Sequence, residues 1–180
     1  NFVADAGATE VFEINNSYPG GRPSTIGFWK NWNSCTGGGQ VDNAIANGGE
    51  TPADRLASGN ALLDDVLQDP GLTVELLNMI ADDNVYVCDD GTQDAVNILD
   101  KRDLSGRKRA SDPAYGLAAQ FLAALANKAV GTCVSTGGVA EQAMIDAQML
   151  LVDIGFDGEG NFLKTKGKSE NPDANLANTL

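Results

Sequence analysis

Residues 25–35 read TIGFWKNWNSC and bring together both tryptophans of the chain, one of its three cysteines and a lysine. Trp29 and Trp32 are three residues apart, so a single helical turn would place the two indoles next to each other, with Phe28 extending the patch. The block has two interpretations. It forms the nucleus of a hydrophobic core, which we favour, or it presents an exposed aromatic platform that stacks on sugars or on a partner.

The composition of the chain limits its partners. Its 180 residues suffice for one well-buried domain, and 25 acidic against 12 basic residues give a formal net charge of -13. This charge repels nucleic acid and anionic lipid, so we expect neither as a partner. No apolar run approaches the roughly 20 residues of a membrane span, so we expect no direct membrane insertion. No signal peptide is recognisable, so in a secreted protein it would already have been removed.

The cysteines favour a crosslink rather than a metal site. Cys35, Cys88 and Cys133 are far apart in the sequence, and the chain has no histidine, so an ordinary zinc site is not expected. The economical interpretation is a disulfide between two of the three, with the remaining thiol either free or bonded to another chain. The absence of histidine also removes the commonest general base.

The first 24 residues differ from the rest and are predicted to form an extended β arm. Val11, Phe12 and Ile14 lie in a run of β-branched and aromatic character, bounded by glycine and proline. Three roles are open for such a strand: closing a preceding β domain, docking on a neighbouring subunit, or serving as a flexible leader. Asn15 begins an Asn-Asn-Ser glycosylation sequon, which matters only in a secreted protein.

Residues 25–180 are predicted to form a compact, mainly α, multi-helix domain. Thr51-Pro52 and Thr73 are helix starts, and Thr92 could cap a further helix through Leu99. The clearest helix begins at Ser111-Asp112-Pro113, is rich in alanine and ends at Gly131. A helix over 139–154 follows, and the two are expected to form a central helical hairpin. A last short helix is expected from Asn171-Pro172 to Leu180.

Two charged features suggest binding. Asp157, Glu159 and Asn161 place oxygen side chains at alternate positions, as at the start of an EF-hand, but the later positions of that motif are Phe162 and Lys168. An ordinary EF-hand is therefore excluded, and a looser calcium loop stays open, so calcium is the only ion suggested and no cofactor is required. The basic segments 101–103 and 107–109 favour docking on an acidic surface, on another copy or on the same domain.

Several blocks together resemble a known domain. TIGFWKNW at 25–32, NILDKRD at 97–103, SDPAYGLAAQFLAA at 111–124 and AQMLLVDIGFDG at 147–158 keep one order along the chain. In this order they resemble an uncharacterised domain with a G-[FY]-W-K-N signature from large secreted and surface-attached bacterial proteins. The resemblance implies a domain that follows immunoglobulin-like or other β repeats, and it implies no enzymatic activity.

The favoured function is a non-enzymatic structural module outside the cell or on its surface. It would be a subunit or terminal domain of a surface layer, sheath or filament, with other copies of itself or neighbouring surface-protein domains as partners. The alternative is a calcium-dependent adhesion module that binds glycans through exposed tryptophans. A hydrolase that uses a pair of carboxylates is less favoured, because no pair of acidic residues stands out in the sequence by apolar neighbours that would form a pocket around it.

Overall fold

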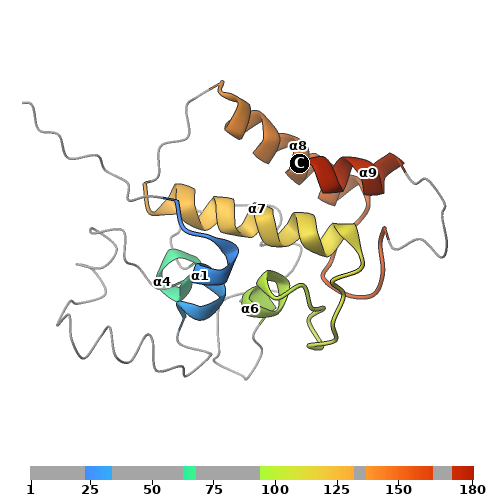
Figure 1. The fold of residues 1–180 in the computed structure, drawn as a ribbon, viewed down its shortest axis with the longest axis horizontal. Helices are drawn as coiled ribbons and strands as arrows, with labels where there is room; N and C mark the ends of the chain where they lie inside the picture. The colour runs from blue at the N-terminus through green and yellow to red at the C-terminus, as the bar shows by residue number, and fades with distance from the viewer. Residues whose placement is uncertain (1–22, 34–62, 68–93, 132–136, 164–171) are drawn as a thin grey trace, which may run out of the picture.

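The computed structural model describes residues 23–33, 63–67, 94–131, 137–163 and 172–180, and these ranges are mainly helical (Figure 1). Their helices are α1 (Ile26–Asn31), α4 (Leu63–Leu67), α6 (Asp94–Leu99), α7 (Pro113–Ala129), α8 (Val139–Asp153) and α9 (Pro172–Thr179). The expectation of a compact, mainly helical domain is confirmed. Within these ranges the only β pairing is an isolated antiparallel bridge between Arg102 and Lys108.

Helix α7 is the centre of the fold. It contacts each of the other five described helices, and Figure 1 shows it crossing the middle of the molecule. The Asp112 side chain caps its first turn by accepting from the Ala114 amide, and Pro113 occupies the first helical position, where no amide donor is needed. Gly131 follows its end with a φ of 81°, a conformation suited to glycine.

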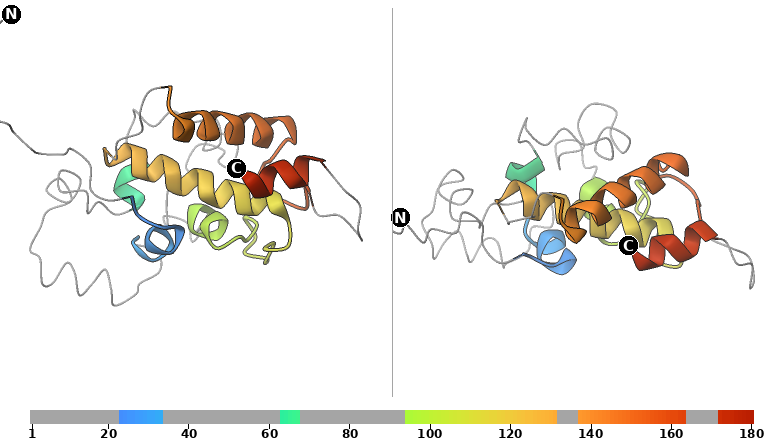
Figure 2. Two further views of the ribbon diagram at one scale, coloured as in Figure 1. Left: turned by 45° about the horizontal axis from the view of Figure 1, so that its top comes forward. Right: turned by 90° about the horizontal axis from the view of Figure 1, so that it is seen from above.

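Alanine on several sides of α7 explains why other helices can pack on it from several directions. Ala114, Ala118, Ala119 and Ala126 are fully buried. Because a methyl group holds a neighbouring helix at only a short distance, helices can approach α7 closely from different directions. Helix α8 runs antiparallel to α7, as the predicted hairpin requires (Figure 2).

Helix α1 carries the aromatic block into the core. Thr25 caps it, since its hydroxyl oxygen accepts from the Phe28 amide at 3.2 Å. Trp29 is fully buried, whereas Phe28 and Trp32 are half-buried. Phe28 contacts both indoles: it meets Trp29 edge to face with ring centroids 5.1 Å apart, and it stacks on Trp32 at 5.3 Å. The aromatic cluster is therefore organised around Phe28.

Some expected elements lie outside the described residues. These are the arm with Val11, Phe12 and Ile14, the sequon at Asn15, the helix expected from Thr73, and Cys35, Cys88 and Cys133. Of the helix expected after Thr51-Pro52, only Leu63–Leu67 is described, as α4. None of the described helices is long and apolar enough to cross a membrane.

Two loops pack together at the N-terminal end of α7. The first, the 100–112 loop, joins α6 to α7, and the second, the 155–163 loop, follows α8. The Leu104 amide donates to the Gly158 carbonyl at 3.0 Å. Gly158 has a φ of 80°, and a Cβ added there would lie 2.9 Å from Leu104 Cγ, which is closer than real contacts allow. The loop contact therefore requires glycine at this position.

Replacing Gly158 by alanine should destabilise the protein more than replacing Gly160. Gly160 also has a positive φ, 86°, but has open space where its Cβ would be. We expect Gly160→Ala to cost about 1–2 kcal/mol from backbone strain alone. Gly158→Ala should add about 1–3 kcal/mol from the clash with Leu104. Urea denaturation would measure both free energies of unfolding, and equal losses would contradict the loop contact.

Candidate functional site

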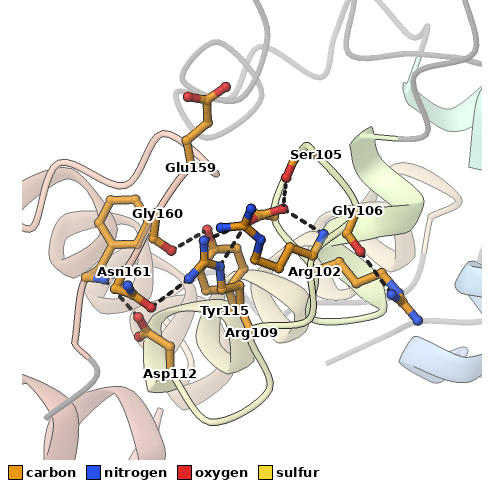
Figure 3. Close-up of polar contacts among 12 residues, drawn as sticks. Arg102, Ser105, Gly106, Arg109, Asp112, Tyr115, Glu159, Gly160 and Asn161 are labelled. Carbon is orange, nitrogen blue, oxygen red and sulfur yellow. Dashed lines mark hydrogen bonds and ion pairs between the residues drawn. The ribbon is translucent and has the colours of Figure 1, made fainter. Parts of the chain in front are cut away.

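The described polar groups converge most densely where these two loops meet the start of α7. We call this group the loop anchor and define it as Asp103, Arg109, Asp112, Tyr115 and Asn161 (Figure 3). Asp103, Arg109 and Asp112 come from the 100–112 loop, and Asp112 is its last residue, directly before α7. Tyr115 lies in the first turn of α7, and Asn161 lies in the 155–163 loop. Two of its members, Asp103 and Asp112, are almost fully buried carboxylates, at 3% and 1% exposure.

Asp103 is held by donors from its own loop. It accepts from the Ser105 hydroxyl at 2.6 Å and from the Arg107 amide at 2.8 Å. Arg109 donates both Nε and Nη2 to Asp103 Oδ2, each at 2.8 Å. Burial acts to raise the pKa of Asp103, but these hydrogen bonds and the Arg109 charge outweigh it and lower the pKa below its ordinary value of 3.8. The carboxylate is therefore charged at neutral pH.

Asp112 joins the helix start to the second loop. Its Oδ1 accepts from the Ala114 amide and from the Leu163 amide, each at 3.1 Å, and its Oδ2 accepts from the Phe162 amide at 2.8 Å. One buried side chain thus caps α7 and satisfies two backbone donors of a segment 50 residues further along.

Arg109 and Tyr115 complete the connection. The Arg109 Nη1 donates to Asn161 Oδ1 at 2.8 Å, and the Tyr115 hydroxyl donates to the Gly160 carbonyl at 3.2 Å. The Tyr115 ring packs edge to face on Phe156, with centroids 5.1 Å apart. Burial, with a contribution from the Asp103 charge, raises the pKa of Tyr115 well above its ordinary value of 10.0. The phenol therefore stays neutral and acts as a donor.

The chemistry of the loop anchor is that of a structural joint. Its carboxylates accept hydrogen bonds from backbone amides, a hydroxyl and a guanidinium of the same chain, and its phenol donates to a backbone carbonyl. Across the described residues, every buried side-chain nitrogen or oxygen has a hydrogen-bond partner. Such a set holds two loops on a helix, because each polar group is bonded to the fold itself.

The three residues suggested as calcium ligands do not converge. Asp157 Oδ1 accepts from the Glu159 amide at 2.8 Å, which forms a local turn, and the Asn161 side-chain oxygen accepts from Arg109. The Glu159 side chain points away from Asn161 and from the loop anchor (Figure 3). Among the residues with described positions, no three acidic or thiol side chains are grouped to hold a metal. Calcium binding by this loop remains a prediction without a preformed ligand set.

The aromatic residues suggested as a core or a platform differ in burial. Trp29 donates its indole Nε1–H to Asn127 Oδ1 at 3.2 Å and is fully enclosed, so it is inaccessible to a sugar. The Asn127 side chain also accepts from the Ser24 amide and donates to the Ser24 carbonyl, at 2.8 and 2.9 Å. Asn127 therefore ties the start of α1 to the C-terminal part of α7.

The lysine of the aromatic block forms part of an ion-pair chain. Lys30 Nζ lies 2.8 Å from Asp100 Oδ1, and Arg102 Nε lies 2.6 Å from Asp100 Oδ2. The Lys30 hydrogen bond, followed by that of Arg102, lowers the pKa of Asp100. Each of these side chains is about a third exposed, from 32% to 39%, so the pairs are screened by water.

Comparison with known proteins leaves the resemblance as a prediction. No protein-family model, no curated protein and no solved structure matches the chain. The structure places residues of these blocks in contact in two pairs. Lys30 of the first block pairs with Asp100 of the second, and Tyr115 of the third packs on Phe156 of the fourth.

Sequence reasoning placed the helix start at Ser111-Asp112-Pro113 but gave Asp112 no contact with the second loop. The Asp-Pro pair signals a helix start, whereas nothing local indicates that Phe162 and Leu163 would donate to the same carboxylate. Asn127 and Tyr115 were missed for the same reason. The only available signal was a polar side chain within a long apolar helix pattern.

Substituting the buried Asp103 should lower the free energy of unfolding more than substituting Asp100, which is about a third exposed. Asp103→Asn removes a charge that accepts from several donors, and we expect a loss of about 3 kcal/mol in the free energy of unfolding. Asp100→Asn is the matched control and should cost less than about 1 kcal/mol. Urea denaturation at pH 7 measures both, and similar losses would show that Asp103 is not the stronger contributor.

The Asp103 contribution should also depend on pH. Because folding lowers the pKa of Asp103, its stabilising effect is fully present above the unfolded value of 3.8. The effect is lost as the pH falls through the lower, folded value. We expect the stability difference between the unmodified protein and Asp103→Asn to be constant near neutrality and to shrink in acid. A constant difference down to the acid-unfolding region would contradict this assignment.

The two tryptophans should differ in accessibility. In a Trp32→Phe variant the remaining indole, Trp29, should emit at short wavelength and resist acrylamide quenching, because it is enclosed. In Trp29→Phe the half-buried Trp32 should be quenched more strongly. Circular dichroism would check that both variants fold. Strong quenching of Trp29, or a change in its emission on adding oligosaccharides, would instead support an aromatic platform.

Proposed function

We propose that this domain is a non-enzymatic structural module outside the cell or on its surface, and that it is a subunit or terminal domain of a surface layer, sheath or filament. In this role copies join through the N-terminal arm, residues 1–24, which precedes the helical domain in the sequence. The partners are other copies of the chain or neighbouring surface-protein domains.

The observation that supports this role most strongly is that the buried aromatic and polar residues bond to other parts of the same domain. Trp29, Asp103, Asp112 and Tyr115 bond to or pack on the domain itself. None of them is in the lining of either pocket described among the placed residues. An enzyme needs polar groups held free for a substrate. Here the polar groups instead rigidify the connections between helices, as a scaffold requires.

The composition supports the same role. A net charge of -13 keeps separate copies soluble and makes association depend on a specific apolar contact. The arm offers such a contact through Val11, Phe12 and Ile14, in a segment with the β-branched and aromatic content of a strand. A disulfide formed by two of the three cysteines would stabilise the module outside the cell by about 2–4 kcal/mol.

Assembly should depend on the apolar residues of the arm. In the full chain we expect Phe12→Ser with Ile14→Ser to abolish large particles in analytical ultracentrifugation and filaments or sheets in electron microscopy. The physical reason is the loss of two apolar side chains that would be buried between copies. Phe2→Ser with Val3→Ser is the matched control, since it removes the same kinds of side chain nearer the terminus.

Both variants should be tested with and without reductant, which separates arm docking from a disulfide between chains. Assemblies that vanish only on reduction would assign the joint to the odd cysteine instead. A full chain that stays monomeric at all concentrations would contradict the structural role.

A further inference from the structure

An apolar groove runs between α7 and α8. Its volume is about 380 Å³, within the range of pockets that enclose a ligand. Its walls are formed chiefly by Leu117, Phe121 and Ala124 of α7 and by Ala143, Met144 and Ala147 of α8. The alanines present only methyl groups to the groove, and none of the lining residues that the structure describes has a charged side chain. A groove of this kind favours an apolar occupant.

The arm joins the described fold at this groove. Pro23 is part of its lining, and the next residue, Ser24, is bonded through its backbone to Asn127, another lining residue. The described part of the chain therefore begins at the edge of the groove. Ile14 is nine residues before Pro23, and nine extended residues reach up to about 30 Å, so residues 11–14 have the length to enter a groove on another copy.

We propose that the groove between α7 and α8 receives residues 11–14 of the arm of a second copy. This inference rests on the proposed function and adds the surface on which the arm docks. Leu117 and Asn127 are ten residues apart on α7, so the groove extends about 15 Å along the helix. Four extended residues span about 10 Å, which fits within that length.

The alternation of apolar and charged residues in the segment 12–14 suits docking on one apolar surface. In an extended chain Phe12 and Ile14 point to the same side, and Glu13 points to the other. Phe12 and Ile14 would enter the groove while the Glu13 carboxylate stays in water. Because the described lining residues have no charged side chains, they add no like-charge repulsion toward the Glu13 carboxylate of a second chain.

Photo-cross-linking with isotope-labelled chains tests this docking. Phe12 is replaced by the photoreactive analogue p-benzoylphenylalanine in the full chain, and ¹⁴N and ¹⁵N proteins are mixed, assembled and irradiated. We expect arm peptides joined to peptides of α7 or α8, including pairs of mixed isotope content. The same analogue at Phe2 is the control and should give few such pairs.

A groove-filling variant gives a second readout. Ala140 lies in the groove lining and is exposed, so Ala140→Trp should be tolerated and should lower the yield of mixed pairs several-fold. Gln142→Trp is the matched control, because Gln142 is exposed on the same helix but does not line the groove. Unchanged yield in Ala140→Trp would overturn the assignment of the groove.

The outcomes separate this inference from the proposed function. Assemblies in which Phe12 cross-links to other surfaces would overturn the groove assignment and leave the structural role intact. Cross-links to α7 and α8 within single-isotope pairs only would show that the arm docks on its own domain, and would overturn docking between copies. A chain that remains monomeric in sedimentation would overturn the structural role as well.

Discussion

The close packing of five helices around α7 is the constraint on which the other described features depend. A helix can be covered from several directions only if its side chains are small enough for its neighbours to approach, and α7 meets this condition with alanine. Larger residues such as Leu122 and Tyr115 fill the spaces that remain. Because α1, α6, α8 and α9 are all positioned against one helix, a displacement of α7 would affect each of them.

Packing several helices on α7 creates a second requirement, which is to hold in place the segments that meet its two ends. The loop anchor does this at the N-terminal end, where Asp112 serves both the helix start and the 155–163 loop. Asn127 does it near the C-terminal end, where it holds Ser24 and Trp29. Both devices use single polar side chains with several partners, so a few buried polar groups are enough to align segments far apart in the sequence.

These devices also clarify how an acidic chain keeps a stable interior. Asp103 and Asp112 are buried only where guanidinium or backbone amides meet their oxygens, which offsets the cost of removing a charge from water. The net negative charge of the chain makes copies repel one another and so disfavours non-specific association. In the module we propose, the apolar residues of the arm and the groove between α7 and α8 would provide the specific contact between copies.

The sequence by itself determined the helical class, the start of α7 at Ser111-Asp112-Pro113 and the ends of α7 and α8. These depend on periodicity and on residues within a turn of each other, so they can be read locally. It did not determine that Phe28 would join the two indoles, or that Asn127 would bind both Trp29 and Ser24. It also suggested a calcium loop at 157–161, whereas Asn161 binds Arg109 from a distant loop. Only the tertiary structure decided these partners, because a side chain bonds to whichever group the packing of helices brings within reach, and that distance is not encoded in local spacing.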